Sequence, residues 1–262
     1  MKICRFIPVL LGIVVVTLTT SCITESTGRM QSAANPTEAA ELNVQLGIEY
    51  LRQGDWQTAR FKLEKALELD SKNIVAHRAI AFVYQNLGDT DAAERHYRKA
   101  VSLAPKNPDA LDGLAVYLCR DDDSRDEALE LFDRALAIPL SSTFSNKAMI
   151  YTNAGVCMKR VDLARAEDYL RAALVADPRY AEALLQIADV SFQRDNYLQA
   201  RAFLQRHLAI AAPSPGALWL GSRIETALGD FRAADDFGNQ LRKEFPESVE
   251  TRQLLEQLRD TG

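Results

Sequence analysis

Small and apolar residues recur along most of this chain with a period of 34 residues. The recurring positions are Leu46-Gly47, Ile80-Ala81 and Leu114-Ala115; Tyr50 and Tyr84; Gly54 and Gly88; Ala59 and Ala93; and Ala66 and Ala100. Between these positions the aliphatic residues stand among Ala, Glu, Gln and Arg, and glycine and proline are few, which favours helices over strands. The pattern therefore predicts an all-α protein built from repeated units.

The repeat resembles the tetratricopeptide repeat (TPR), in which each unit is a helix, a turn and a second helix. Small residues such as Gly47 and Ala81 would let the two helices approach closely. Gly54 and Gly88 would end the first helix in a turn, and Pro105 would end the second, because proline cannot continue a helix. The resemblance implies a right-handed superhelical solenoid.

About six units and a closing helix account for residues 40–260. We expect the units at about 40–73, 74–107, 108–141, 147–180, 181–214 and 215–248, and the closing helix at 249–260. The third unit gains one residue in the turn RDDDSRDE, and a longer insertion follows Pro139. The closing helix covers the apolar face that the last unit of a solenoid would otherwise expose.

The N-terminus is typical of a secretory signal. Two basic residues precede an apolar stretch from Phe6 to Leu18, and small residues then lead into Cys22. The apolar stretch is too short to cross a bilayer as a helix, which needs about 20 residues. The small residues ending on cysteine resemble the lipobox of bacterial lipoproteins, although Thr19 stands where leucine is usual. This implies a signal peptide at 1–21 and a diacylglycerol on the sulfur of Cys22.

The residues after the cysteine indicate where the lipoprotein would reside. Ile23 stands where an aspartate would favour the inner membrane, so the resemblance implies an outer-membrane anchor facing the periplasm. Residues 22–39 show no apolar period, and we interpret them as a flexible tether. A chain of that length would let the body lie on the order of 20 Å from the lipid surface.

The mature chain would keep two cysteines, Cys119 and Cys157. The repeat places both near the ends of the first helices of neighbouring units, with Cys157 at the tyrosine position of the fourth unit. Such helices pack side by side, so the separation of about 6 Å between Cα atoms that a disulfide needs is attainable. We expect a disulfide in an oxidising compartment, and two buried free thiols are the alternative.

Several segments resemble one group of TPR proteins. They are LAVYLCR, YTNAGVCMKR, AEDYLRAAL, ALWLGSRIETALGD and LRKEFPES. With the lipobox, they resemble the type IV pilus biogenesis lipoproteins of the PilF/PilW pilotin family. The resemblance implies a protein that binds the pilus secretin and promotes its outer-membrane localisation and multimerisation. The alternative is a TPR lipoprotein scaffold for outer-membrane protein assembly or peptidoglycan turnover.

A binding surface follows from the register. The concave face of such a solenoid is lined by the second, fifth, ninth and twelfth positions of each first helix. In the first two units these positions include Val44, Ile48, Leu51, Val75, Arg78, Phe82 and Gln85. We expect an apolar groove there that binds a protein partner. Alternatively, Ile48 and Leu51 cover the tether or an N-terminal helix.

The sequence gives little support for nucleic-acid binding, catalysis or metal binding. The formal net charge of −5 disfavours nucleic acid. The chain has no HExxH, GxxxxGK[ST] or GxSxG motif. His77, His96 and His207 are far apart in the register, so we expect surface or packing residues and not metal ligands. We therefore predict no enzyme, cofactor, metal or small-molecule substrate; an envelope hydrolase with a solenoid arm would need a catalytic constellation that the sequence lacks.

Overall fold

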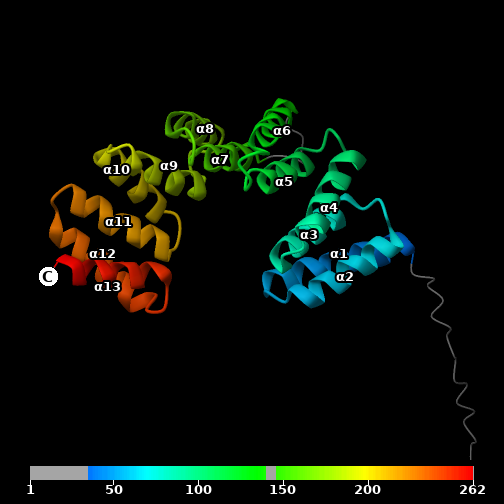
Figure 1. Cartoon of the computed structure of the whole chain (residues 1–262), viewed down its shortest axis with the longest axis horizontal. Helices are drawn as coiled ribbons and strands as arrows, with labels where there is room; N and C mark the ends of the chain where they lie inside the picture. The colour runs from blue at the N-terminus through cyan, green and yellow to red at the C-terminus, as the bar shows by residue number, and fades with distance from the viewer. Residues whose placement is uncertain (1–34, 140–145, 262) are drawn as a thin grey trace, which may run out of the picture. The chain divides into compact units, whose positions relative to one another are not determined.

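In the computed structural model, residues 35–139 and 146–261 are described and contain thirteen helices and no strand (Figure 1). The helices are α1 (Pro36–Arg52), α2 (Trp56–Leu69), α3 (Ile74–Leu87), α4 (Thr90–Leu103), α5 (Pro108–Leu118), α6 (Arg125–Ala137), α7 (Lys147–Met158), α8 (Leu163–Ala176), α9 (Ala181–Gln193), α10 (Tyr197–Leu208), α11 (Pro215–Ala227), α12 (Phe231–Glu244) and α13 (Val249–Thr261). The predicted signal peptide at 1–21 and Cys22 lie outside the described residues.

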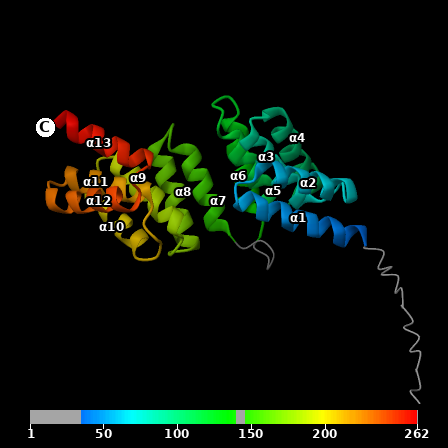
Figure 2. The ribbon, with the colours of Figure 1, turned by 90° about the horizontal axis from the view of Figure 1, so that it is seen from below.

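The helices are arranged as six consecutive pairs followed by α13. Each odd-numbered helix from α1 to α11 packs against the even-numbered helix after it, and also against the next odd-numbered helix. The last helix, α13, contacts both α11 and α12, as Figure 2 shows. The predicted all-α TPR solenoid with a closing helix is therefore confirmed.

Local sequence explains where the helices begin and end. Side chains of Asp or Asn cap the N-termini of α2, α3, α4, α5, α7, α8 and α12 by accepting hydrogen bonds from N–H groups of the first turn. Gly54, Gly88 and Gly229 have φ of 75°, 84° and 78° in the turns between paired helices. In the fifth pair Asp195 takes this left-handed conformation, with φ of 60°, which Asp adopts more readily than most residues.

The first helix begins earlier than the sequence predicted. α1 starts at Pro36, so the last four residues assigned to the tether, 36–39, are helical. Proline suits the first position of a helix, because its fixed φ is already helical and its missing N–H has no partner there in any case. Ala40, one turn later, is completely buried, so the start of α1 belongs to the packed body.

Close approach of the paired helices depends on small residues. A Cβ atom added to Gly47 in α1 would lie 2.6 Å from Cγ of Leu63 in α2, and one added to Gly221 in α11 would lie 2.8 Å from Cδ1 of Phe237 in α12. Real Cβ atoms do not come so close to a neighbouring side chain, so these helices could not pack in this way around a larger residue.

The fourth pair follows the same rule in a shifted register. A Cβ added to Gly155 in α7 would lie 2.7 Å from Cγ of Leu170 in α8. Gly155 therefore fills the role that the sequence assigned to Ala154, because the stretch from Gly155 to Ala166 is one residue shorter than the corresponding stretch in the first pair. Cys157 accordingly lies one position before the tyrosine position, and Met158 occupies that position.

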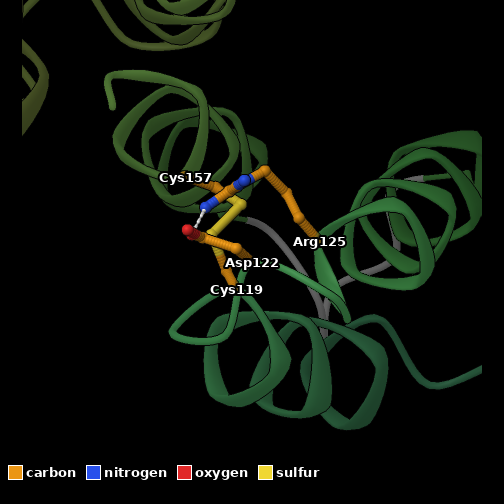
Figure 3. The surroundings of a disulfide bond; sticks show 4 residues. All are labelled: Cys119, Asp122, Arg125 and Cys157. Carbon is orange, nitrogen blue, oxygen red and sulfur yellow. Dashed lines mark hydrogen bonds and ion pairs between the residues drawn. A yellow bond between two sulfur atoms is a disulfide. The ribbon is translucent and has the colours of Figure 1, made fainter. Parts of the chain in front are cut away.

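The two cysteines are bonded to each other. Cys119 at the end of α5 and Cys157 in α7 form a disulfide with their Cα atoms 5.7 Å apart. Figure 3 shows the ion pair between Asp122 and Arg125 lying against this bond. The disulfide joins the third and fourth pairs on either side of residues 140–145.

Two histidines that the sequence placed far apart are neighbours. Nδ1 of His77 in α3 lies 2.9 Å from Nδ1 of His96 in α4, and Nε2 of His77 lies 3.1 Å from the carbonyl oxygen of Ser71. If His77 donates to Ser71 through Nε2–H, its Nδ1 can accept from Nδ1–H of His96, so both rings are neutral. Burial lowers the pKa of both rings, that of His96 to about 4. The third histidine, His207, is buried, and its Nδ1 lies 2.9 Å from the carbonyl oxygen of Ala181.

We expect Gly155→Ala to destabilise the protein and Gly216→Ala not to. The first substitution forces Leu170 to move and should cost roughly 1–3 kcal/mol in unfolding free energy. Gly216 in α11 has no atom within 4 Å of an added Cβ, so alanine there should be neutral or stabilise by up to about 1 kcal/mol. Urea denaturation followed by circular dichroism measures both; equal midpoints for the two variants would contradict this packing account.

Acid should destabilise the second helix pair through His96. Its folded pKa of about 4 lies below the value of about 6.5 expected in the unfolded chain, so stability is lost as the pH falls from about 6.5 towards 4. We expect His96→Gln to remove roughly 2 kcal/mol of this loss. The difference between the unfolding free energies of the two proteins at pH 7 and pH 4.5 isolates the effect, and identical pH profiles would refute it.

Candidate functional site

An apolar groove runs along the first and second helix pairs and reaches the first helix of the third pair. It has a volume of about 290 Å³, and its walls come from α1, α3, α4 and α5. The lining residues are Ile48, Leu51, Val75, Arg78, Ala79, Phe82, Tyr97 and Gly113. Residues three or four positions apart lie on one face of a helix, and this spacing brings the α1 and α3 side chains to the same surface.

Large apolar side chains remain accessible in this groove. Phe82 is 43% exposed and Val75 is 48% exposed, while Ile48 and Leu51 are half-buried. The Phe82 ring is held from one side by Trp56 of α2, edge to face, with the ring centroids 6.0 Å apart. A partner that covered Phe82 and Val75 would remove apolar surface from water, which favours binding.

One charged side chain lines the groove. Nη1 of Arg78 lies 3.7 Å from a carboxylate oxygen of Asp109. Within the described residues, Nε of Arg78 is buried and has no hydrogen-bond partner. Arg78 and Tyr97 both pack over Gly113, where an added Cβ would lie 3.6 Å from Nε of Arg78 and 3.4 Å from Cε1 of Tyr97. The Arg78 side chain as a whole is 31% exposed, so its guanidinium group can donate to an acceptor on a bound protein.

A buried carboxyl group lies beyond Asp109 on α5. Asp112 accepts hydrogen bonds from Nδ2 of Asn153 in α7 at 2.9 and 3.0 Å. Burial raises the pKa of Asp112 to about 6, and both the hydrogen bond from Asn153 and the charge of Arg78 oppose that rise. Asp112 thus links the third and fourth pairs by a polar contact, and its charge depends on pH near neutrality.

Five of the seven residues that the sequence assigned to the groove line it in the structure, and two do not. Ile48, Leu51, Val75, Arg78 and Phe82 lie along it. The assignment of Val44 was wrong: it is only 6% exposed and packs against the buried alanines of α2 and α3. Gln85 is half-buried and does not line the groove.

Three groove residues were not predicted from the sequence: Ala79, Tyr97 and Gly113. Tyr97 comes from a second helix, and its repeat position indicated only a residue that fills space between units. Gly113 lies one residue before the recurring pair Leu114-Ala115. Only the structure shows that Arg78 packs against it. No sequence signal marked any of the three as part of a binding surface.

Within residues 35–139 and 146–261, no group of three or more His, Cys, Asp or Glu side chains could hold a metal ion. In the same part of the chain, no helix combines the length and the apolar character required to cross a membrane.

Comparison with known proteins identifies the fold family. Two tetratricopeptide-repeat family models match residues 50–116 and 158–215. An uncharacterized protein of Haemophilus influenzae is 30% identical over 162 residues, which are 57% of this chain and 88% of that protein.

Proteins of the type IV pilus are similar over most of the chain. The type IV pilus assembly protein PilF of Pseudomonas aeruginosa is 27% identical over 233 residues, 88% of this chain and 91% of PilF. PilW, a widely conserved type IV pilus biogenesis factor, is 28% identical in sequence. Its crystal structure matches this one with a TM-score of 0.71 over 82% of this chain and 98% of PilW. A structure of Pseudomonas aeruginosa PilF gives a TM-score of 0.68 at 25% identity, over 85% of this chain and 99% of that one. The chain therefore belongs to the tetratricopeptide-repeat family of PilF and PilW, the type IV pilus proteins to which it is homologous.

Proposed function

We propose that this protein is an outer-membrane lipoprotein pilotin that binds the type IV pilus secretin and promotes its localisation and multimerisation. The observation that carries the proposal is the apolar groove of the first two helix pairs, in a chain homologous to two pilus biogenesis proteins. The proposal assigns the protein a binding role and no catalytic step.

The groove suits an apolar segment of a protein partner. An amphipathic helix or an extended peptide could bury its apolar side chains against Val75 and Phe82. The partly exposed guanidinium group of Arg78 could donate a hydrogen bond to that segment and so fix its orientation. Apolar contact would then supply most of the affinity, and one polar contact would contribute to specificity.

The lipid anchor would determine at which membrane the groove binds its partner. Cys22 precedes α1 by 14 residues, so a diacylglycerol on its sulfur would tether the groove within a short reach of the membrane. A secretin subunit bound to the groove would then share the membrane to which the lipid directs this protein. Stable anchoring needs more than one acyl chain, and a lipidated N-terminal cysteine provides them.

We expect Val75→Glu to reduce the affinity for the purified secretin at least tenfold. A carboxylate placed in the groove would lose its hydration when the apolar segment binds. Val175→Glu is the matched control, because Val175 is 85% exposed on α8 and lies outside the groove. Binding is measured by surface plasmon resonance and secretin multimers by non-denaturing gels of membrane fractions. Full multimer formation with Val75→Glu would argue against the groove as the secretin site.

We also expect Cys22→Ala to release the protein from the outer membrane and to move the secretin out of that fraction. The substitution removes the sulfur that would carry the lipid, while the groove is unchanged. Cys4→Ala, inside the predicted signal peptide, is the control that keeps Cys22. Fractionation followed by immunodetection of both proteins measures the result. Normal secretin multimers in the outer-membrane fraction of the Cys22→Ala strain, or of a strain without this protein, would contradict the pilotin role.

A further inference from the structure

A second pocket of about 290 Å³ lies where α5 meets α7. Its lining includes Val116 and Val156 together with both cysteines of the disulfide, and Arg120 and Arg160. Asn153, whose side chain is engaged by Asp112, completes the lining. None of these residues lines the groove of the first two pairs, so the pocket is a separate surface.

The apolar part of this pocket is open to solvent. Val116 is 42% exposed and Val156 is 40% exposed. Each directly follows the small residue of its helix, Ala115 or Gly155, just as Phe82 follows Ala81. The two valines therefore take the same register position that Phe82 takes in the groove, and the disulfide between them adds further apolar surface.

The charged part of this pocket is positive. Arg120 and Arg160 are exposed, and within the described residues neither side chain has a hydrogen bond or an ion pair within 4.0 Å. Asp122, an acidic side chain beside the disulfide, is paired with Arg125 (Figure 3), and this hydrogen bond holds the pKa of Asp122 below its usual range. Arg160 lowers that pKa slightly through its charge alone. Both guanidinium groups of the pocket can therefore still bind carboxylates.

We propose that this pocket binds an acidic, apolar segment of a protein partner. A leucine-sized side chain would enter between Val116 and Val156 and contact the disulfide, and flanking Asp or Glu carboxylates would pair with Arg120 and Arg160. The planar guanidinium group forms two parallel hydrogen bonds with a carboxylate. Arginines beside an apolar depression are also enriched where proteins bind one another. Nucleic acid is disfavoured, because the chain carries a net charge of −5.

The site is tested by charge reversal with two synthetic peptides. Both are fluorescein-labelled helical 14-residue peptides with the same leucines; one carries glutamates and the other carries lysines at the flanking positions. We expect the glutamate peptide to bind the native protein, and Arg120→Glu with Arg160→Glu to weaken it at least tenfold in fluorescence anisotropy. The lysine peptide should bind this double variant more tightly than it binds the native protein.

Two matched controls separate the pocket from general charge and folding effects. Arg95→Glu with Arg232→Glu makes the same change of charge at exposed positions of α4 and α12, and should leave the glutamate peptide's affinity within about twofold. Val156→Asp should abolish binding, whereas Val161→Asp, at a valine that is 59% exposed after α7, should not. Circular dichroism confirms that each variant is folded.

Three results would overturn the proposal. They are a dissociation constant above about 1 mM for the glutamate peptide, an equal loss in the Arg95 and Arg232 control, and a lysine peptide that gains nothing from charge reversal. Loss of peptide binding with Val75→Glu and not with charge reversal would place the peptide in the groove instead. That result would leave the proposed secretin site intact while removing this one, so the two proposals fail separately.

Discussion

Close approach of the two helices within each pair is the constraint on which the rest of the structure depends. Three of the pairs achieve it with a glycine opposite a large side chain. In other pairs the corresponding residues, Ala81, Ala115 and Ala188, are completely buried. Because each unit contacts only its neighbours, the core is distributed along the solenoid, and the stability of the whole is close to a sum of units and interfaces. A larger residue at one such position would disturb one unit and the contacts beside it.

The same constraint creates the binding surfaces. When the small residue of a first helix faces its partner helix, the residue after it is turned by about 100° towards the face that the first helices share. Phe82, Val116 and Val156 occupy that position, and each remains about 40% exposed. Their exposure follows from the packing of the residue before them. The groove and the pocket are therefore two parts of one repeated geometry, which differ in the polar side chains around them.

Ion pairs and a disulfide add to the apolar packing and to the Asn153–Asp112 hydrogen bond between helix pairs. Ion pairs join neighbouring pairs along the solenoid, such as Arg98 with Glu127 and Lys159 with Asp189. These side chains are partly exposed, so each ion pair contributes little to the stability of the fold. The disulfide joins the third and fourth pairs, whose sequence is interrupted by residues 140–145. A covalent bond at this point stabilises mainly by restricting the unfolded chain.

The sequence alone determined the helices, the turns and the repeat, because each of these depends on residues within one 34-residue unit. It also placed Ile48, Leu51 and Phe82 on one face, since helical spacing requires only local geometry. Glycine in the turns and small residues between the helices have the same local origin.

Tertiary structure decided the features that depend on contacts between units. Val44 is buried because alanines of α2 and α3 close over it, and His77 meets His96 because α3 and α4 pack antiparallel. The register of α7 shifts to Gly155 because the stretch from Gly155 to Ala166 is one residue shorter than the stretch from Gly47 to Ala59. Tyr97 joins the groove from a second helix. A periodic sequence specifies which face of a helix is apolar, but only the packed neighbours determine which of those side chains stay accessible to a partner.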